Sequence, residues 1–335
     1  MKLPTLSIDL GSSVTKMYQI GAGVVLAEPS VVAVNETGKK RVKAIGAEAK
    51  SLIGKTVDGT IVSSPVVEGQ IYEEHTAVLM LENFLNKATL RRLGRRPSVV
   101  FAVPCGADNA SIKKFEEVLN DCDVFNINFV ESPVLAAIGA GVHLTESNPC
   151  FIIDIGGGTT NIAAVSLGGV ISGISVNIGG KTLDNMIIDY IEKDFELKIG
   201  RLSAERLKIQ VASLLADDNT TTIVNGRDLS SGKPRAINVS SSDLYPVIKQ
   251  FFDKIFELAG MVMAKLPAEI SADVRREGVY FTGGTSKLIG LEEYFRFIMG
   301  IKANVSEEPS FAVAVGGGMV AGNEKLLARL RINRR

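Results

Sequence analysis

The sequence lacks the residue types that disulfide frameworks and transition-metal sites require. It has no tryptophan, two histidines and three cysteines in 335 residues. Cys105, Cys122 and Cys150 form no Cys-x-x-Cys spacing, so we expect reduced, buried thiols, as is typical of a cytoplasmic protein. His75 and His143 lie far apart in the sequence, which excludes a local cluster with transition-metal spacing.

Long apolar runs and an excess of one charge are also missing. No uninterrupted apolar run approaches the roughly 18 residues of a membrane span. The start, MKLPTLSIDLG, has no charged segment followed by an apolar one, so we expect neither a membrane helix nor a signal peptide. Basic and acidic residues balance at 37 each, so no global charge attracts nucleic acid and we expect no nucleic-acid partner. The length and a hydrophobic content of 46% predict a globular protein of two domains.

Glycine, by contrast, is abundant, and two glycine-rich segments match each other in order. Residues 9–15 read DLGSSVT and residues 154–160 read DIGGGTT. Each segment lies between two short apolar runs, a pattern that predicts a β-hairpin.

A second matched pair occurs later in each half of the chain. Residues 133–142, PVLAAIGAGV, and residues 309–320, PSFAVAVGGGMV, both begin with proline, which suits a first helical turn, and continue as small-residue helices. The same two features in the same order predict an internal duplication, with a first domain at 1–145 and a second at 146–322.

Strands and helices alternate between these landmarks. Residues 98–104 and 126–132 have strand patterns on either side of a helical pattern at 110–122, which predicts parallel strands with helical crossovers and an α/β fold. The second half is expected to contain helices at 182–195 and 203–216, the latter capped by Ser203, and a small subdomain with short strands at 217–242.

The glycine-rich turns have the chemistry of a phosphate site. Without β-carbons, the backbone N–H groups of Gly156, Gly157 and Gly158 can approach an anion closely. Two such hairpins facing each other would hold the phosphate chain of a nucleotide from both sides. Asp9 and Asp154 would repel phosphates unless a cation intervenes, which points to Mg²⁺ held through its water molecules. The alternative is two ordinary hairpin turns whose aspartates bond the backbone.

Two further segments could complete a nucleotide site. TGGTSK at 282–287 lacks the ending of a Walker A loop, but a strand followed by two glycines at a helix start allows close approach of a base or ribose. Glu205 and Lys208 share one helix face and could grip ribose hydroxyls, or they could form a solvated surface pair. The expected nucleotide-binding residues are Gly11, Ser12, Ser13, Thr15, Gly156, Gly157, Gly158, Thr159, Thr160, Glu205, Lys208, Gly283, Gly284 and Thr285.

Taken together, these segments resemble the five motifs of the actin-like ATPase superfamily, which includes DnaK-type chaperones and sugar kinases. They occur in order as DLGSSVT, ESPVLAAIGAG, DIGGGTTN, FTGGTSK and AVAVGGGMVAG. Within the superfamily the chain resembles the MreB family of bacterial actins over nearly its whole length. The stretches that carry this resemblance include VVLAEPSVVAVN (24–35), AIGAEAKSLIGKT (44–56), FAVPCG (101–106) and NGRDLSSGKPR (225–235).

The resemblance implies an actin-like (ribonuclease H-like) duplicated fold, with two domains around a cleft for ATP or ADP and Mg²⁺. It implies a smaller inserted subdomain in each half, IB near 33–65 and IIB near 181–245, and a C-terminal helix or tail at 323–335 that packs back on the first domain.

The resemblance also implies roles for single residues. By motif match, Glu131 positions the attacking water, and Thr159 contacts the γ-phosphate and helps to orient that water. Asp154 completes the catalytic set, because positioning and charge neutralisation carry most of phosphoryl transfer.

Several positions depart from the family pattern. Ser12, Ser13 and Val14 replace Thr-Ala-Asn, Asn161 stands where glutamate is usual, and Lys181 replaces an acid.

In function, the resemblance implies a slow ATPase that polymerises into paired protofilaments at the inner face of the cytoplasmic membrane. Its partners would be cell-wall elongation or shape-determining proteins. The alternatives are an adaptor or chaperone-like member without filament function, and a sugar kinase. We expect no substrate-binding domain after the nucleotide domain and find no sugar-facing catalytic aspartate, which favours the filament former.

A membrane contact is expected at residues 87–97, KATLRRLGRRP. The first strand begins near Leu6, which leaves no room for an N-terminal amphipathic helix. Leu90 and Leu93 stand among lysine and arginine residues. Two apolar side chains surrounded by basic residues could insert into an anionic bilayer. The alternative is a helix end with dipole-favoured arginines and both leucines packed on the core.

Overall fold

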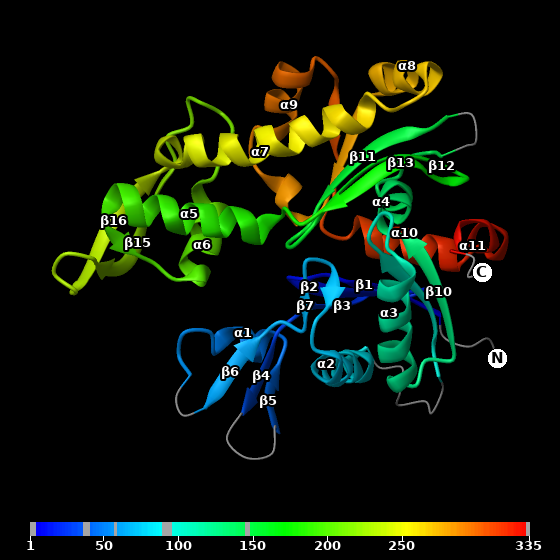
Figure 1. Ribbon diagram of the computed structural model, residues 1–335, viewed down its shortest axis with the longest axis horizontal. Helices are drawn as coiled ribbons and strands as arrows, with labels where there is room; N and C mark the ends of the chain where they lie inside the picture. Colours follow the sequence, from blue (N-terminus) through cyan, green and yellow to red (C-terminus); the bar gives the residue numbers. More distant parts are fainter. Residues whose placement is uncertain (1–4, 36–40, 57–58, 89–95, 145–147, 333–335) are drawn as a thin grey trace.

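Two five-stranded sheets form the centre of the molecule (Figure 1). The computed structural model describes residues 5–35, 41–56, 59–88, 96–144 and 148–332. The first sheet has the order β10-β9-β1-β2-β3, with β1 (Thr5–Leu10), β2 (Val14–Gln19), β3 (Gly23–Pro29), β9 (Ser98–Val103) and β10 (Asn126–Glu131). The second has the order β13-β12-β11-β17-β18, with β11 (Cys150–Ile155), β12 (Thr160–Ser166), β13 (Gly169–Val176), β17 (Val279–Thr282) and β18 (Ala303–Val305).

Both sheets follow the same plan. Three consecutive antiparallel strands come first, and two parallel strands then extend the sheet on the other side of the first strand. The crossover between the parallel strands is helical in each case: α3 (Asn109–Asp121) in the first half and α9 (Leu291–Met299) in the second. The predicted hairpins, parallel crossovers, α/β class and internal duplication are therefore confirmed.

Two small-residue helices cross between the halves. α4 (Ser132–Gly139) packs on β11 and β12 of the second sheet, while α10 (Ala312–Ala321) packs on β1 and β9 of the first. A β-carbon added at Gly139 would lie 1.8 Å from the backbone oxygen of Ala312, and one at Gly316 would lie 1.9 Å from that of Leu135. The two helices therefore touch through their backbones, which no larger residue would permit.

Smaller sheets lie on the outer sides of the two halves, farthest from this crossing (Figure 1). The first contains β4 (Val32–Asn35), β5 (Arg41–Ile45), β6 (Thr60–Ser63) and the short helix α1 (Ala47–Ser51). The second contains β14 (Leu197–Lys198), β15 (Thr221–Asp228) and β16 (Pro234–Ser240), beside α5 (Gly180–Phe195) and α6 (Arg201–Val211). The remaining elements are the hairpin β7 (Val66–Val67) and β8 (Gln70–Ile71), and the helices α2 (Glu74–Lys87), α7 (Ser241–Met263), α8 (Ala268–Glu277), η2 (Gly284–Lys287) and α11 (Glu324–Leu330).

Two local predictions were wrong. Ser203 does not cap a helix, because α6 already begins at Arg201 after Gly200 and ends at Val211. The chain leaves the helix there because Leu214 N–H donates to the Ile289 oxygen at 2.8 Å, a strand-type contact that competes with further helix. Pro309 lies outside the first turn of α10, whose N-cap is Phe311, whereas Pro133 does lie in the first turn of α4.

Aromatic packing fills the second half, where Phe256 contacts the rings of Phe281 and Phe295. All three cysteines are buried and free, as predicted.

After α11, Ile332 N–H donates to the Phe129 oxygen at the edge of the first sheet. None of the helices in the described part of the chain is long and apolar enough to cross a membrane.

Candidate functional site

The two glycine-rich turns face each other between the halves. The first turn, residues 11–13, joins β1 to β2, and the second turn, residues 156–159, joins β11 to β12. A β-carbon added at Gly157 would lie 2.1 Å from Ser13 Oγ, and one at Gly158 would lie 2.6 Å from Ser12 Oγ. Glycine is required at positions 157 and 158 because the side chains of Ser12 and Ser13 fill the space that larger residues there would take.

A cavity of about 490 Å³ opens beside these turns. Its lining includes most of the residues that the sequence predicted for a nucleotide: Asp9, Gly11, Ser12, Ser13, Asp154, Gly156, Gly157, Gly158, Thr159, Glu205, Lys208, Gly283, Gly284 and Thr285. With Ser132 and Val313, which also line this cavity, the structure gathers residues from all five motifs around one space.

Three predicted site residues are not part of this lining. Thr15 Oγ1 and Ser30 Oγ are hydrogen-bonded at 2.8 Å, and Thr160 Oγ1 donates to the Ile178 oxygen at 2.7 Å, so both threonine hydroxyls stabilise the turns from behind. Glu131 caps α4 next to the lining residue Ser132, and its Oε1 accepts a hydrogen bond from Gly106 N–H at 2.9 Å.

Asp154 is buried at the floor of the cavity. Its Oδ1 accepts from Thr282 Oγ1 at 3.0 Å and its Oδ2 from Asn161 Nδ2 at 3.4 Å. Burial, and after it the negative charge of Asp9, raises the pKa of Asp154 to about 6. A cation near both carboxylates would relieve this cost, since opposite charge favours the ionised form.

The donor set fits a hydrated divalent cation. Among the residues that the structure describes, no group of three or more His, Cys, Asp or Glu side chains is placed to hold a metal. Asp9 and Asp154 alone suit Mg²⁺, which retains several waters and takes further oxygen ligands from substrate phosphates.

Lys16 is a site residue that the sequence analysis missed. Its Nζ lies 2.8 Å from Asp9 Oδ2, both side chains are 17% exposed, and Lys16 lines the cavity. The antiparallel register pairs Asp9 with Lys16, so counting outward from the predicted turn would have placed the two side chains together.

Glu205 and Lys208 line the cavity but do not pair with each other. Lys208 Nζ lies 2.7 Å from Asp184 Oδ1 and donates to the Gly180 oxygen at 2.9 Å. Glu205 instead reaches across to Lys50 on α1, with 2.7 Å between Oε2 and Nζ. The alternative of a solvated surface pair is thus excluded by geometry. Asp184, a further lining residue, was not recognised from the sequence.

Other polar contacts lie at or near the cavity. Gly69 N–H, in the β7–β8 hairpin, donates to Ser12 Oγ at 3.1 Å, and Asn177 Nδ2 donates to Glu68 Oε2 at 2.8 Å. Lys181 donates to the Ser12 carbonyl at 2.5 Å, so this departure from the family pattern becomes a contact with the first turn.

The TGGTSK segment forms the remaining wall. Gly283 has φ +83°, and a β-carbon there would lie 2.2 Å from the Ile155 oxygen, so glycine is required at this position. Thr285 Oγ1 donates to the Gly156 oxygen at 3.1 Å, which ties this wall to the second turn.

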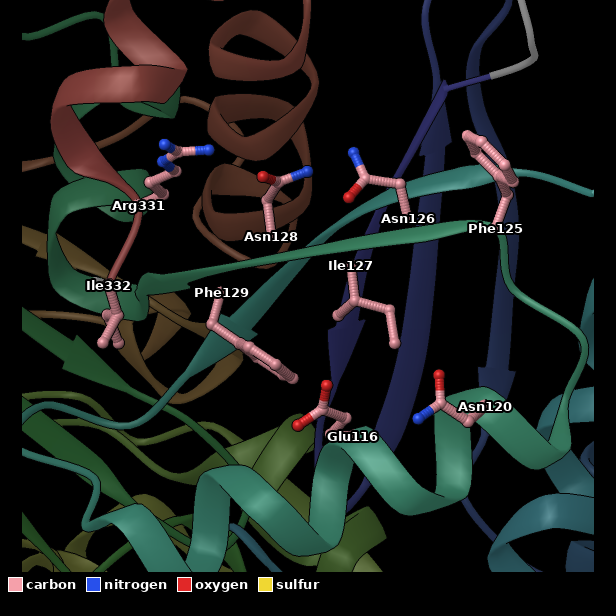
Figure 2. A pocket seen from close by; sticks show the side chains of 9 residues that line it. All are labelled: Glu116, Asn120, Phe125, Asn126, Ile127, Asn128, Phe129, Arg331 and Ile332. Carbon is pink, nitrogen blue, oxygen red and sulfur yellow. The ribbon is translucent and has the colours of Figure 1, made fainter. Parts of the chain in front are cut away.

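A second cavity of about 470 Å³ lies at the outer edge of β10 (Figure 2). There Ile127 and Phe129 point toward α3, from which Glu116 and Asn120 project. None of the predicted site residues lines it. The predicted membrane contacts, Leu90 and Leu93, lie outside the described residues.

Duplicated sheets, crossing small-residue helices and paired glycine-rich turns around one cavity define an actin-like protein. The fold is shared by the structure titled MamK double helical filament, with a TM-score of 0.79 over 96% of this chain and 99% of that one, at 19% identity. The family model described as MreB/Mbl protein matches residues 3–329. The chain therefore belongs to the MreB/Mbl family.

Individual relatives align with this chain over almost its whole length. The chain is 32% identical to the cell shape-determining protein Mbl of Bacillus subtilis, covering 98% of both sequences. It is 34% identical to the cell shape-determining protein MreB of Escherichia coli K12, covering 93% of this chain and 92% of that one. Among solved structures, MreB5 of Spiroplasma citri bound to ADP matches with a TM-score of 0.92 and 27% identity, covering 97% of this chain and 98% of that one.

Proposed function

We propose that the protein binds ATP or ADP with Mg²⁺ in the cavity between its halves and hydrolyses ATP slowly. The observation that carries this proposal is the meeting of two glycine-rich turns beside one cavity, each preceded by an aspartate. The matched structures of Spiroplasma citri MreB5, bound to ADP and to AMPPNP, support the same use of the cleft.

The residues divide the work by position. Backbone N–H groups of both turns, with the hydroxyls of Ser12, Ser13 and Thr159, hold the phosphates. Asp9 and Asp154 hold Mg²⁺ through its waters, and the ion neutralises phosphate charge. Glu205 and Lys208 contact the ribose. The base side of the nucleotide is contacted by Gly283, Gly284 and Thr285.

Hydrolysis depends on Glu131, with Thr159 helping to orient the attacking water. The Glu131 carboxylate is bonded to Gly106 N–H, one residue before the lining residue Ser132. It therefore has to turn toward the cavity to orient water, which fits a slow enzyme whose turnover waits for a conformational step.

We further propose that ATP-bound molecules polymerise into paired protofilaments in the cytoplasm, at the inner face of the cytoplasmic membrane. There they would help to organise cell shape and cell-wall synthesis with other shape-determining proteins. The names of the curated relatives, cell shape-determining proteins Mbl and MreB, support this proposal, as does the filament of MamK.

Sedimentation at increasing protein concentration, with ATP, ADP or no nucleotide, tests the proposal. We expect a pelleted fraction that appears above a critical concentration and is largest with ATP. The matched variant is Asp154→Ala, which should pellet less at equal concentration. Nucleotide binding without any pelleting would favour the alternative, an adaptor or chaperone-like member of the superfamily.

A further inference from the structure

Asn161 joins the two halves of the site through one buried side chain. It lies on β12 opposite Asp154, and it is 4% exposed. Its Nδ2 donates to Asp154 Oδ2 at 3.4 Å, and its Oδ1 accepts from Cys105 N–H at 3.0 Å. Asp154 belongs to the second half and Cys105 to the first. Both ends of the amide are therefore hydrogen-bonded, one to each half.

The other side of this contact is the segment that holds Glu131. Cys105 follows Pro104 at the end of β9, and the next N–H, that of Gly106, donates to Glu131 Oε1 at 2.9 Å. The Cys105 thiol packs on the second sheet, because a β-carbon added at Gly173 would lie 2.8 Å from Cys105 Sγ. Three hydrogen bonds and the backbone of residues 105–106 therefore connect Asp154 through Asn161 to Glu131.

An amide matches both partners of residue 161 in this chain. Cys105 N–H offers a donor and the Asp154 carboxylate offers an acceptor, and asparagine has one group for each. A glutamate or aspartate at 161 would place another carboxylate beside Asp154 and could not donate to it when ionised. An apolar residue would leave the buried Cys105 N–H without a partner, which costs stability.

We propose that Asn161 is a positioning residue that transmits the position of Asp154 to Glu131 through residues 105–106. The inference rests on the proposed function of the cleft as a nucleotide site. When phosphates change the position of the Asp154 carboxylate, the amide follows it, and the Gly106 N–H moves with Cys105. The Glu131 carboxylate is thereby held or released according to what the cavity contains.

The first test measures how firmly the hydrogen bond between Asn161 and Cys105 N–H holds the segment at residues 105–106, and it needs no nucleotide. Burial raises the pKa of the Cys105 thiol to about 12, so a closed Cys105 reacts slowly with alkylating reagents. Asn161→Ala should raise the rate of Cys105 alkylation by iodoacetamide about tenfold, the scale of losing one buried hydrogen bond from a local opening equilibrium. Cys122 and Cys150, followed in the same sample by peptide mass spectrometry, should not change.

Asn177→Ala is the matched control, since it removes another asparagine that joins the two halves, at Glu68 rather than at Cys105. It should leave all three rates unchanged. An unchanged Cys105 rate in Asn161→Ala would overturn the proposal. A rise at all three cysteines would overturn it too, because that result means general loosening of the fold.

The second test asks whether Asn161 acts through Glu131. We expect Asn161→Ala to lower ATP turnover about tenfold while ADP affinity stays within about threefold, and to have no further effect on turnover in a Glu131→Ala background. Asn161→Asp, which keeps the acceptor for Cys105 and loses the donor to Asp154, should lower turnover while Cys105 alkylation stays within about twofold of wild type.

Additive losses of turnover in the Asn161→Ala/Glu131→Ala double variant would refute the proposal that Asn161 acts through Glu131. Equal losses of ADP affinity and turnover in Asn161→Ala would refute it too. If the wild-type protein binds no nucleotide, the proposed function fails instead, and that result is read directly from the ADP titration.

Discussion

Replacing Gly157 by alanine should stop the two glycine-rich turns from meeting. The new β-carbon would lie 2.1 Å from Ser13 Oγ and 2.6 Å from Ser13 Cβ. Carbon atoms in contact sit about 3.5–4.0 Å apart, so the turns must separate by about 1 Å. Loss of one hydrogen bond between a backbone N–H and a charged phosphate costs about 1.5–3 kcal/mol, which weakens ATP binding by about ten- to hundredfold.

Titration with a fluorescent ATP analogue measures this change against two controls. Gly168→Ala lies in the turn at the other end of β12, where the nearest atom, Ser166 Oγ, is at an ordinary 3.5 Å, so it should bind like wild type. Adding Ser13→Gly to Gly157→Ala removes the clashing atoms and should recover part of the affinity. If Gly157→Ala binds as tightly as Gly168→Ala, or if Ser13→Gly recovers nothing, the steric argument is wrong.

Three further predictions concern hydrolysis, the metal and the membrane. Glu131→Ala should keep nucleotide binding but slow phosphate release about tenfold, about 1.4 kcal/mol in the barrier, and an unchanged rate would remove Glu131 from the mechanism. Asp154→Ala should weaken ATP binding more in Mg²⁺ than in EDTA, because its proposed partner is the hydrated ion; equal losses would make it a structural turn residue. Leu90→Ser/Leu93→Ser should polymerise but pellet less with anionic vesicles than wild type, and full pelleting would exclude these leucines as the anchor, while unfolding would place them in the core.

The sequence predicted the features that are local and repeated. Each glycine-rich turn is framed by its own strands, so both hairpins and their duplication follow from patterns of a few residues. The lining residues of the turns, including Asp9 and Asp154, were found for the same reason.

Contacts between distant segments could not be predicted in this way. The end of α6 depends on a pairing of Leu214 with Ile289, which no local pattern contains. The hydrogen bond from Cys105 to Asn161 joins residues 56 positions apart, and no local pattern links the two. Thr15 fits the motif, yet the direction of its hydroxyl toward Ser30 is set by the packing of β2 and β3.

The crossing of α4 and α10 has a mechanical consequence. At Gly139 and Gly316 the two helices meet backbone to backbone, so no side chains interlock there to resist a small relative twist. The crossing is therefore a place where the two halves could rotate relative to each other, and the outer subdomains that contain α1 and α6 lie far from it (Figure 1). A small rotation there would displace the outer subdomains, where Lys50 meets Glu205, more than it displaces the residues at the crossing. Such a rotation would couple a shift at the turns to a change of the outer shape, the surface that a neighbouring molecule in the proposed filament would contact.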